Sequence, residues 1–349
     1  MSIKIKAVAF KDIKQVELVE RETPDLRPDE VLVKVHAVAL CTMEQRLFTG
    51  ALKMPMLATG GHEVAGEIVA MGSAVNKKKW ADHDRVVVRL LFNCGECYYC
   101  RTGHTNMCEK SKSRPVRENL LPGPGGGLAD YVITNAASLF KIPDTLSYEE
   151  ACLTEPLACV VHSVNRANIQ LGEDVAVIGG GIMGQYHVML AKRKGARVIL
   201  SEVDPARAEL AKKLGADIVF NPMEVDPVEF VKSVTEGRGA DVVFNTTAIA
   251  AVVPQAIAMT GKAGRMIQYS SMHPDAPAPV SPQMLHGNEV VLTGSISPDG
   301  NDFFTANRLL NSGIVDCKPM IAKTFPLEQA QAAFEAATVP GTFRVIVTD

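Results

Sequence analysis

The sequence lacks three features that would assign it to particular classes of protein. No apolar run approaches the roughly 20 residues that a membrane-spanning helix needs, and the N-terminal segment has no apolar core of the kind that signal peptides carry. Positive charge is not in excess either, because 36 Lys and Arg residues face 39 Asp and Glu residues, a net charge of −3. These absences predict a cytoplasmic protein that binds neither a membrane nor nucleic acid.

The length and the pattern of the chain favour two domains. Its 349 residues are more than one small domain with a single core ordinarily contains, and 47% of them are hydrophobic. The first part predicts short strands separated by Gly and Pro, whereas from about residue 165 apolar strands alternate with helices, as in a parallel sheet covered on both faces. We therefore predict a two-domain α/β protein. Residues 1–160 and 291–349 form a β domain, and residues 161–290 form an inserted, doubly wound domain.

Four of the eight cysteines lie close together with the spacing of metal ligands. Cys94, Cys97, Cys100 and Cys108 are separated by two, two and seven residues. In a chain without an export signal, metal ligation is a better interpretation than disulfides. Four thiolates complete a tetrahedral shell, which predicts a structural zinc in a lobe of about residues 91–112. The cysteines outside the candidate zinc sites are expected to be buried free thiols: Cys152, Cys159 and Cys317.

A second group of residues can supply only part of a metal shell. Cys41 lies upstream of a Gly61-His62-Glu63 triplet, so a thiolate, an imidazole and a carboxylate can act as metal ligands. Such a set leaves a position for water or substrate, as a catalytic zinc requires.

A glycine-rich turn follows an apolar strand and opens a helix. It consists of Gly179, Gly180, Gly181, Ile182, Met183 and Gly184. In this context, Gly179 permits the tight turn, Gly181 the close approach of a pyrophosphate to the helix N-terminus, and Gly184 close helix–strand packing. The alternative is a glycine-rich turn that binds nothing.

The residues after the next strand indicate which dinucleotide binds. Glu202 ends that strand, where a carboxylate meets the ribose hydroxyls and repels a 2′-phosphate, which favours NAD over NADP. Arg207 complicates this prediction, because an arginine there can contact a phosphate; a surface or adenine-stacking role is the other interpretation. Ser295 is a further candidate contact for the cofactor or the substrate.

These motifs together resemble those of the zinc-dependent medium-chain dehydrogenase/reductase superfamily, which includes alcohol, threonine and polyol dehydrogenases. The resemblance covers essentially the whole chain and is carried by Cys41, the stretch from Gly61 to Gly66, the four-cysteine lobe, Glu155-Pro156-Leu157, the glycine-rich turn and Glu202. It implies a GroES-like β domain and a Rossmann domain. It also implies two zinc ions per subunit, one catalytic and one structural, NAD as cofactor, and a homodimer or homotetramer.

By that resemblance, Cys41 and His62 hold the catalytic zinc, with Glu63 and Glu155 as carboxylates that ligate it directly or through water. Glu155 followed by Pro-Leu is similar to the polyol dehydrogenases, because liver-type alcohol dehydrogenases have a cysteine there. A carboxylate makes a harder site, which suits a substrate with two vicinal oxygens. The alternative for Glu155 is a capping role at the helix that begins there, where negative charge is favourable.

One departure from the family pattern concerns the proton of the alcohol. Many relatives have Ser or Thr two residues after the first zinc cysteine, whereas this sequence has Met43, whose thioether cannot relay a proton. Thr42, Glu63, Glu155 or a zinc-bound water must take that role, or the route differs. Glu44 is expected to orient His62 as a hydrogen-bond partner.

The reaction implied is the reversible oxidation of a secondary alcohol to a ketone, with zinc as Lewis acid and hydride transfer to the nicotinamide. The Glu155-Pro156 pair favours a sugar alcohol, sugar or related polyol as the substrate, and L-threonine is the alternative. A different class of hypothesis is a non-catalytic sensor that binds zinc and NAD. The departure at Met43 favours it, and the intact ligand set argues against it. A zinc-free quinone or enoyl reductase would not need these ligands.

Overall fold

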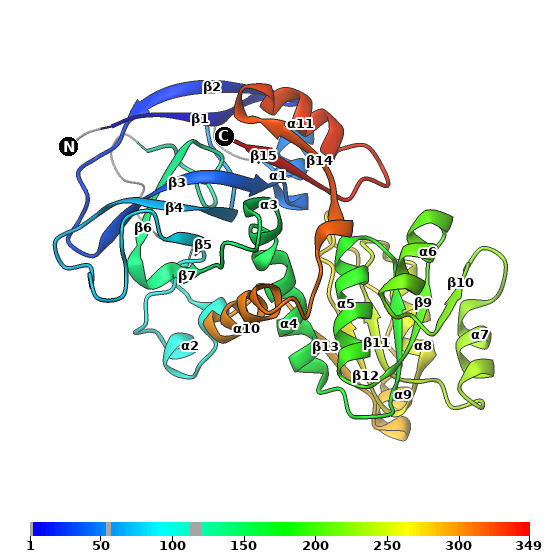
Figure 1. Cartoon of the computed structure of the whole chain (residues 1–349). Coiled ribbons are helices and arrows are strands. Elements are labelled where there is room, and N and C mark those ends of the chain that lie inside the picture. The colour runs from blue at the N-terminus through cyan, green and yellow to red at the C-terminus, as the bar shows by residue number, and fades with distance from the viewer. Residues whose placement is uncertain (1–2, 54–56, 112–119) are drawn as a thin grey trace. The chain divides into compact units, whose positions relative to one another are not determined.

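The computed structural model describes residues 3–53, 57–111 and 120–349. The chain forms two compact units (Figure 1). The first comprises Met1–Ala158 together with Asp299–Asp349, and the second comprises Cys159–Pro298. Each unit has its own sheet.

The first unit is built on a seven-stranded sheet in which most neighbours are antiparallel. Along the sheet the strands are β14 (Ile321–Pro326), β15 (Arg344–Thr348), β3 (Glu30–Ala39), β4 (Glu63–Met71), β5 (Arg85–Arg89) and β7 (Leu139–Lys141), while β6 (Tyr131–Asn135) also pairs with β3. A separate hairpin pairs β1 (Lys4–Asp12) with β2 (Gln15–Glu22). Strand β3 is buried along most of its length, as its run of valines predicts.

Short helices connect and cover these strands. They are α1 (Thr42–Thr49), α2 (Tyr98–Arg101), η1 (Thr105–Met107), η2 (Ala136–Ser138), α3 (Tyr148–Ala151), α10 (Gly300–Asn311), η3 (Lys318–Met320), η4 (Leu327–Gln329) and α11 (Ala330–Ala337). Phe334 of α11 is fully buried and packs on Phe10 and Phe48, with ring centroids 5.4 and 5.0 Å away. The C-terminal segment therefore contributes to the same core as the first strands of the chain.

The second unit contains a six-stranded parallel sheet. Its strand order is β10 (Ile218–Phe220), β9 (Arg197–Ser201), β8 (Asp174–Ile178), β11 (Ala240–Asn245), β12 (Thr260–Gln268) and β13 (Val291–Gly294). The helices in and leading into this unit are α4 (Thr154–Ala167), α5 (Ile182–Arg193), α6 (Pro205–Leu214), α7 (Pro227–Val234), α8 (Val252–Met259) and α9 (Pro282–Asn288).

This strand order is that of a Rossmann fold. The chain proceeds outward from β8 to β10 on one side, and then from β11 to β13 on the other, so the order reverses between β8 and β11. Ligands of open parallel sheets bind beside such a reversal, at the carboxyl ends of the strands. The turn that follows β8 is the glycine-rich segment singled out in the sequence.

One boundary differs from the sequence-based division. The sequence pattern places β13 in the β domain, but this strand pairs with β12 in the parallel sheet of the second unit. A short exposed strand such as this carries no pattern that assigns it to one sheet, and only its partner decides. The predicted cysteine lobe is present within the described residues, and its end at residue 112 lies outside them.

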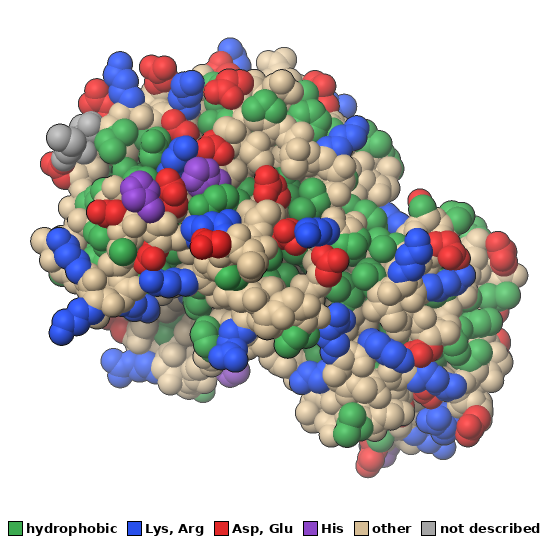
Figure 2. Space-filling view, viewed as in Figure 1, with side chains coloured by type: hydrophobic (Ala, Val, Ile, Leu, Met, Phe, Trp, Pro, Cys, Tyr) green, Lys and Arg blue, Asp and Glu red, His purple; other side chains and the backbone are tan. Residues whose placement is uncertain are grey.

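Charge is mixed on the face of the molecule drawn in Figure 2, where acidic and basic side chains are interspersed. Within the described residues, no helix combines the length and apolar character that crossing a bilayer requires.

A buried histidine lies in the second unit. His187 of α5 is fully buried, its Nε2 lies 2.9 Å from the Ser163 hydroxyl, and its Nδ1 lies 2.7 Å from the Met183 carbonyl oxygen. The rings of Phe244 and Tyr269 enclose it, with centroids 4.5 and 4.8 Å away. Burial lowers the pKa of His187 to about 4.

We predict that His187 makes stability fall with acidification. The unfolded chain protonates this histidine near its ordinary pKa of 6.5, whereas the folded chain keeps it neutral down to about pH 4. Stability is therefore fully present above pH 6.5 and is lost progressively as the pH falls toward 4. Between pH 7 and pH 5, His187→Gln should lose about 2 kcal/mol less unfolding free energy than the wild type. Urea unfolding at several pH values measures this, with the exposed His286→Gln as control. Equal pH slopes in all three proteins would contradict it.

Candidate metal and cofactor sites

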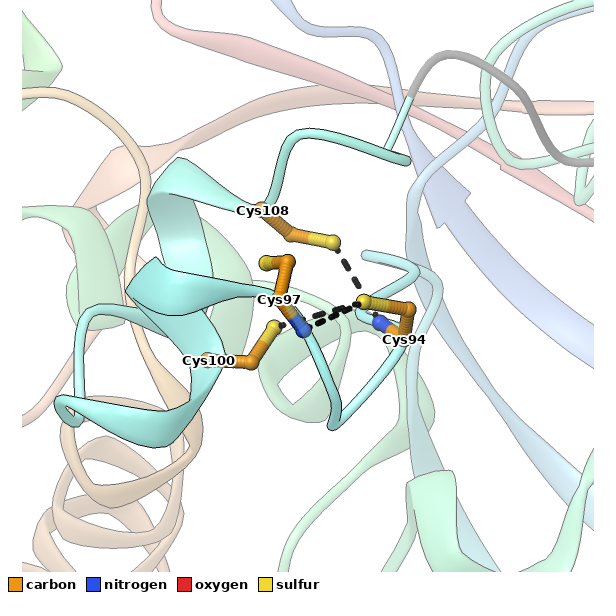
Figure 3. Close-up of side chains that lie close together, drawn as sticks. All are labelled: Cys94, Cys97, Cys100 and Cys108. Atoms are coloured by element: carbon orange, nitrogen blue, oxygen red, sulfur yellow. Dashed lines mark hydrogen bonds between the residues drawn. The ribbon is translucent and has the colours of Figure 1, made fainter.

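The four lobe cysteines converge on one point. Their sulfur atoms all lie within 4.8 Å of one another, and Figure 3 shows the four side chains directed toward a common centre. Helix α2 begins directly after Cys97, and the turn η1 precedes Cys108. The local sequence thus brings all four thiols together within a single loop.

Backbone amides favour the thiolate form of two of the lobe cysteines, Cys94 and Cys97. The Cys94 N–H donates to Cys108 Sγ at 3.3 Å, and the Cys97 N–H donates to Cys94 Sγ at 3.4 Å. Backbone hydrogen bonds from Cys100 and Glu109 lower the pKa of Cys97 to about 6, and those from Glu96 and Cys97 lower the pKa of Cys94. Burial and the neighbouring thiols instead raise the pKa of Cys100 to about 12. The convergence of four sulfur donors, two of them with a lowered pKa, fits a closed structural zinc site.

A second set of donors comes from the edge of the first unit's sheet. Cys41 immediately precedes α1, and His62 and Glu63 lie where β4 begins. One ligand atom from each of the three lies within 4.8 Å of the others. A thiolate, an imidazole and a carboxylate at this spacing fit a zinc ion with a remaining position for substrate.

Glu44 fixes the orientation of His62. The Glu44 carboxylate is fully buried, and its Oε1 lies 2.9 Å from His62 Nδ1 and accepts the Gly61 N–H at 3.0 Å. Although burial opposes ionisation, the charge of His62 and these hydrogen bonds keep the pKa of Glu44 below its usual range. The contact predicted between Glu44 and His62 is present. It engages Nδ1 and leaves Nε2 as the imidazole donor for a metal.

Glu63 makes an ion pair that the sequence did not reveal. Arg344 of β15 donates from Nε to Glu63 Oε2 at 3.0 Å and from Nη2 to Oε1 at 2.5 Å, and both side chains are buried. Burial and the nearby charge of Glu155 raise the pKa of Glu63 to about 7, against the attraction of Arg344. Both carboxylate oxygens are thus held by a guanidinium, and one of them also lies within 4.8 Å of a ligand atom of Cys41 and of His62. The sequence feature that could have indicated this ion pair is the single arginine, Arg344, in an otherwise apolar final strand.

The remaining predicted residues differ in position. Glu155 lies buried in the first turn of α4, outside the three-residue group, and its charge acts on both Glu63 and Arg344. Thr42, the first residue of α1, is exposed.

The glycine-rich turn has the geometry that the sequence pattern suggests. Gly179 has φ of +94°, and a Cβ on Gly184 would lie 1.8 Å from the Gly179 carbonyl oxygen. Gly181 precedes α5, whose first residues are Ile182 and Met183, and a Cβ on it would meet no atom of the described residues within 4 Å. The turn therefore requires glycine at two positions and leaves the backbone accessible at a third.

Polar side chains anchor this turn to the next strand and helix. Glu202 accepts hydrogen bonds from the Gly180 and Asp204 amides. Gln185, which the sequence analysis missed, donates to the carbonyl oxygens of Gly180 and Arg207, both at 2.9 Å. Its position next to Gly184 gave no signal, because an amide in a helix is ordinarily exposed.

Ser295 follows β13 in the same unit as the glycine-rich turn. Its N–H donates to the Gln268 carbonyl oxygen at 3.2 Å, and its hydroxyl oxygen is buried without a hydrogen-bond partner among the described residues.

Sequence comparison gives matches along both units. Residues 27–144 match the alcohol dehydrogenase GroES-like domain, and residues 183–312 match the zinc-binding dehydrogenase family. The chain is 33% identical to sorbitol dehydrogenase of Bacillus subtilis over 95% of its own length and 93% of that protein. It is 31% identical to D-arabitol-phosphate dehydrogenase of Enterococcus avium, covering 95% and 94% of the two chains. It is also 33% identical to L-threonine 3-dehydrogenase of Caldanaerobacter subterraneus, covering 91% of each.

A solved structure supports the same relationship. The putative zinc-binding dehydrogenase of Sinorhizobium meliloti, bound to NADP, superposes with a TM-score of 0.89 at 28% identity, covering 99% of this chain and 100% of that one. The chain therefore belongs to the zinc-dependent medium-chain dehydrogenase/reductase family, in its polyol dehydrogenase branch, with a GroES-like unit and a Rossmann-type unit.

Proposed function

We propose that the protein oxidises a secondary alcohol of a sugar alcohol, sugar or related polyol to a ketone, with NAD as the hydride acceptor. The observation that supports this most directly is the convergence of Cys41, His62 and Glu63. When bound, zinc at this group supplies Lewis acidity for the alcohol oxygen, and NAD takes up the hydride.

The protein's own residues prepare the site. Glu44 holds the His62 ring in one orientation, and Arg344 holds Glu63 in place by a two-point contact. The pKa of Glu63, raised to about 7, suits a group that exchanges a proton near neutral pH. With Met43 at the usual relay position, Glu63 is the carboxylate through which we expect the alcohol proton to leave.

The test of this function is turnover across a substrate panel. Zinc-loaded protein with NAD should oxidise polyols or sugars, and Cys41→Ala should abolish turnover and retain about one zinc instead of two, because the catalytic site loses its thiolate. Cys317→Ala, at a buried cysteine outside both metal groups, is the control and should retain both zinc ions and activity. NADH absorbance and metal analysis provide the readouts.

Other outcomes of the panel select other functions. Turnover of L-threonine alone would replace the polyol assignment with the threonine dehydrogenase one, which the similarity to such enzymes favours. Two bound zinc ions without turnover of any alcohol would favour the sensor.

The role of Glu44 gives a second prediction. Glu44→Gln keeps the side-chain size but removes the charge that orients His62, and we expect affinity for the catalytic zinc to fall about 10- to 100-fold. Competition with a chelator measures this affinity. Glu30→Gln is a matched control, because Glu30 is a buried glutamate of the same unit that accepts a backbone N–H from Arg27. Unchanged zinc affinity in Glu44→Gln would leave Glu44 with a purely structural role.

The choice of dinucleotide gives a third prediction. Glu202→Gln should lower kcat/KM for NAD at least about 10-fold and should narrow the preference for NAD over NADP, since the carboxylate that excludes a 2′-phosphate is gone. The exposed Glu209→Gln of α6 is the control. Wild-type protein that uses NADP better than NAD would show that Glu202 does not set the preference.

A further inference from the structure

A buried arginine ends the strand beside the candidate catalytic group. Arg89 is the last residue of β5 and lies directly opposite Glu63 in the antiparallel pairing of β4 with β5. Glu63 in turn follows His62, so the Arg89 backbone is one strand away from the metal-binding residues. Only 8% of the Arg89 surface is exposed.

Two of the donor nitrogens of Arg89 have no acceptor in the described part of the chain. Nη1 donates to Asn93 Oδ1 at 2.9 Å, while Nε and Nη2 are buried without a hydrogen-bond partner among the described residues. Burial lowers the pKa of the Arg89 guanidinium, and the charges of Asp299, Cys100 and Glu155 oppose this effect. Asp299 itself is engaged in capping α10, where it accepts the amides of Asn301 and Asp302. A buried charged donor without an acceptor is costly, and such groups are rarely left in a fold without a function.

Another arginine of this chain, Arg344, uses the same pair of nitrogens to bind a carboxylate. Nε and Nη2 form one edge of the guanidinium plane, with two parallel N–H groups matched to the two oxygens of an acid. Arg344 uses this edge for the carboxylate of Glu63. In Arg89 the equivalent edge is directed at no protein acceptor in the described structure.

We propose that Arg89 binds an acid group of the substrate, a carboxylate or a phosphate, and so restricts the substrate class to sugar acids or phosphorylated polyols. This inference rests on the proposed polyol dehydrogenase function and specifies its substrate. Neutral hydroxyl groups can accept the same two hydrogen bonds, but the two oxygens of an acid group accept them in a charge-assisted, two-point geometry that is stronger.

The test compares matched pairs of charged and neutral substrates. The pairs are D-gluconate with sorbitol and D-arabitol phosphate with D-arabitol, assayed with zinc-loaded protein and NAD. We expect one charged member to exceed its neutral counterpart in kcat/KM. In Arg89→Gln that kcat/KM should fall about 10- to 100-fold, the range expected for lost hydrogen bonds to a charged group, mainly through KM. Turnover of the neutral members should change little. The pair with the larger difference identifies carboxylate or phosphate as the group that Arg89 binds.

Two further variants separate binding from folding. Arg89→Lys keeps the positive charge but lacks the edge with two parallel N–H groups. Its kcat/KM for the charged substrate should therefore lie between those of Arg89→Gln and the wild type. This variant keeps the test valid if Arg89→Gln folds poorly. Arg101→Gln, at an exposed arginine of the cysteine lobe, should behave as the wild type.

An equal loss for charged and neutral substrates would overturn the inference in favour of a structural role. A wild-type preference for the neutral members would overturn it as well, while leaving the dehydrogenase function intact. Absence of turnover with every polyol would instead count against the proposed function itself.

Discussion

The buried ion pair between Glu63 and Arg344 is the contact on which the geometry of the candidate catalytic group depends. It joins the first residue of β4 to the first residue of β15, across a separation of 281 residues. Strand β3 lies between them in the sheet, so the pair forms only when both outer strands take the correct register. Removing one partner of such a pair leaves an uncompensated buried charge, which typically costs about 3 to 5 kcal/mol. The final strand is therefore as much a part of the site as the residues that precede β4.

In the Rossmann unit, hydrogen bonds to backbone groups, rather than an ion pair, hold the candidate site in place. The glycine-rich turn after β8 has amides that need acceptors, and Glu202 from the end of β9 provides one of them. Gln185 joins the same turn to α6. The residue proposed to select the dinucleotide is thus also a residue that holds the turn. Any change to cofactor specificity at Glu202 has to keep an acceptor for the Gly180 amide, because an unsatisfied buried amide destabilises the fold.

What the sequence predicted well is what local chain geometry determines. The four-cysteine lobe closes within a single loop, and the glycine pattern marks a strand, a turn and a helix that are consecutive in the chain. Spacing alone carries that information. Three important residues went unnoticed: Arg344, Gln185 and Arg89. Each is a polar side chain in a segment whose pattern is otherwise apolar or helical. Arg344 and Gln185 have partners 281 and 22 residues away, and two donor nitrogens of Arg89 have no partner among the described residues, so only the folded structure gives these positions a meaning. The assignment of β13 to the wrong domain has the same cause, because the sheet that a short strand joins is a tertiary property.

The balance of charge around the candidate catalytic group also bears on its substrate. Cys41, Glu44, Glu63 and Glu155 would carry negative charge around a bound zinc ion, and Arg344 and Arg89 carry positive charge. A bound zinc ion would offset two further negative charges, so the group as a whole would be close to neutral. Because these charges would nearly cancel, the interaction of a substrate is decided by its direct contacts rather than by the net charge of the group. Arg344 is already committed to Glu63, which leaves Arg89 as the cation of this set with unpaired donors in the described structure. A substrate that carries its own acid group is the partner that such a residue selects.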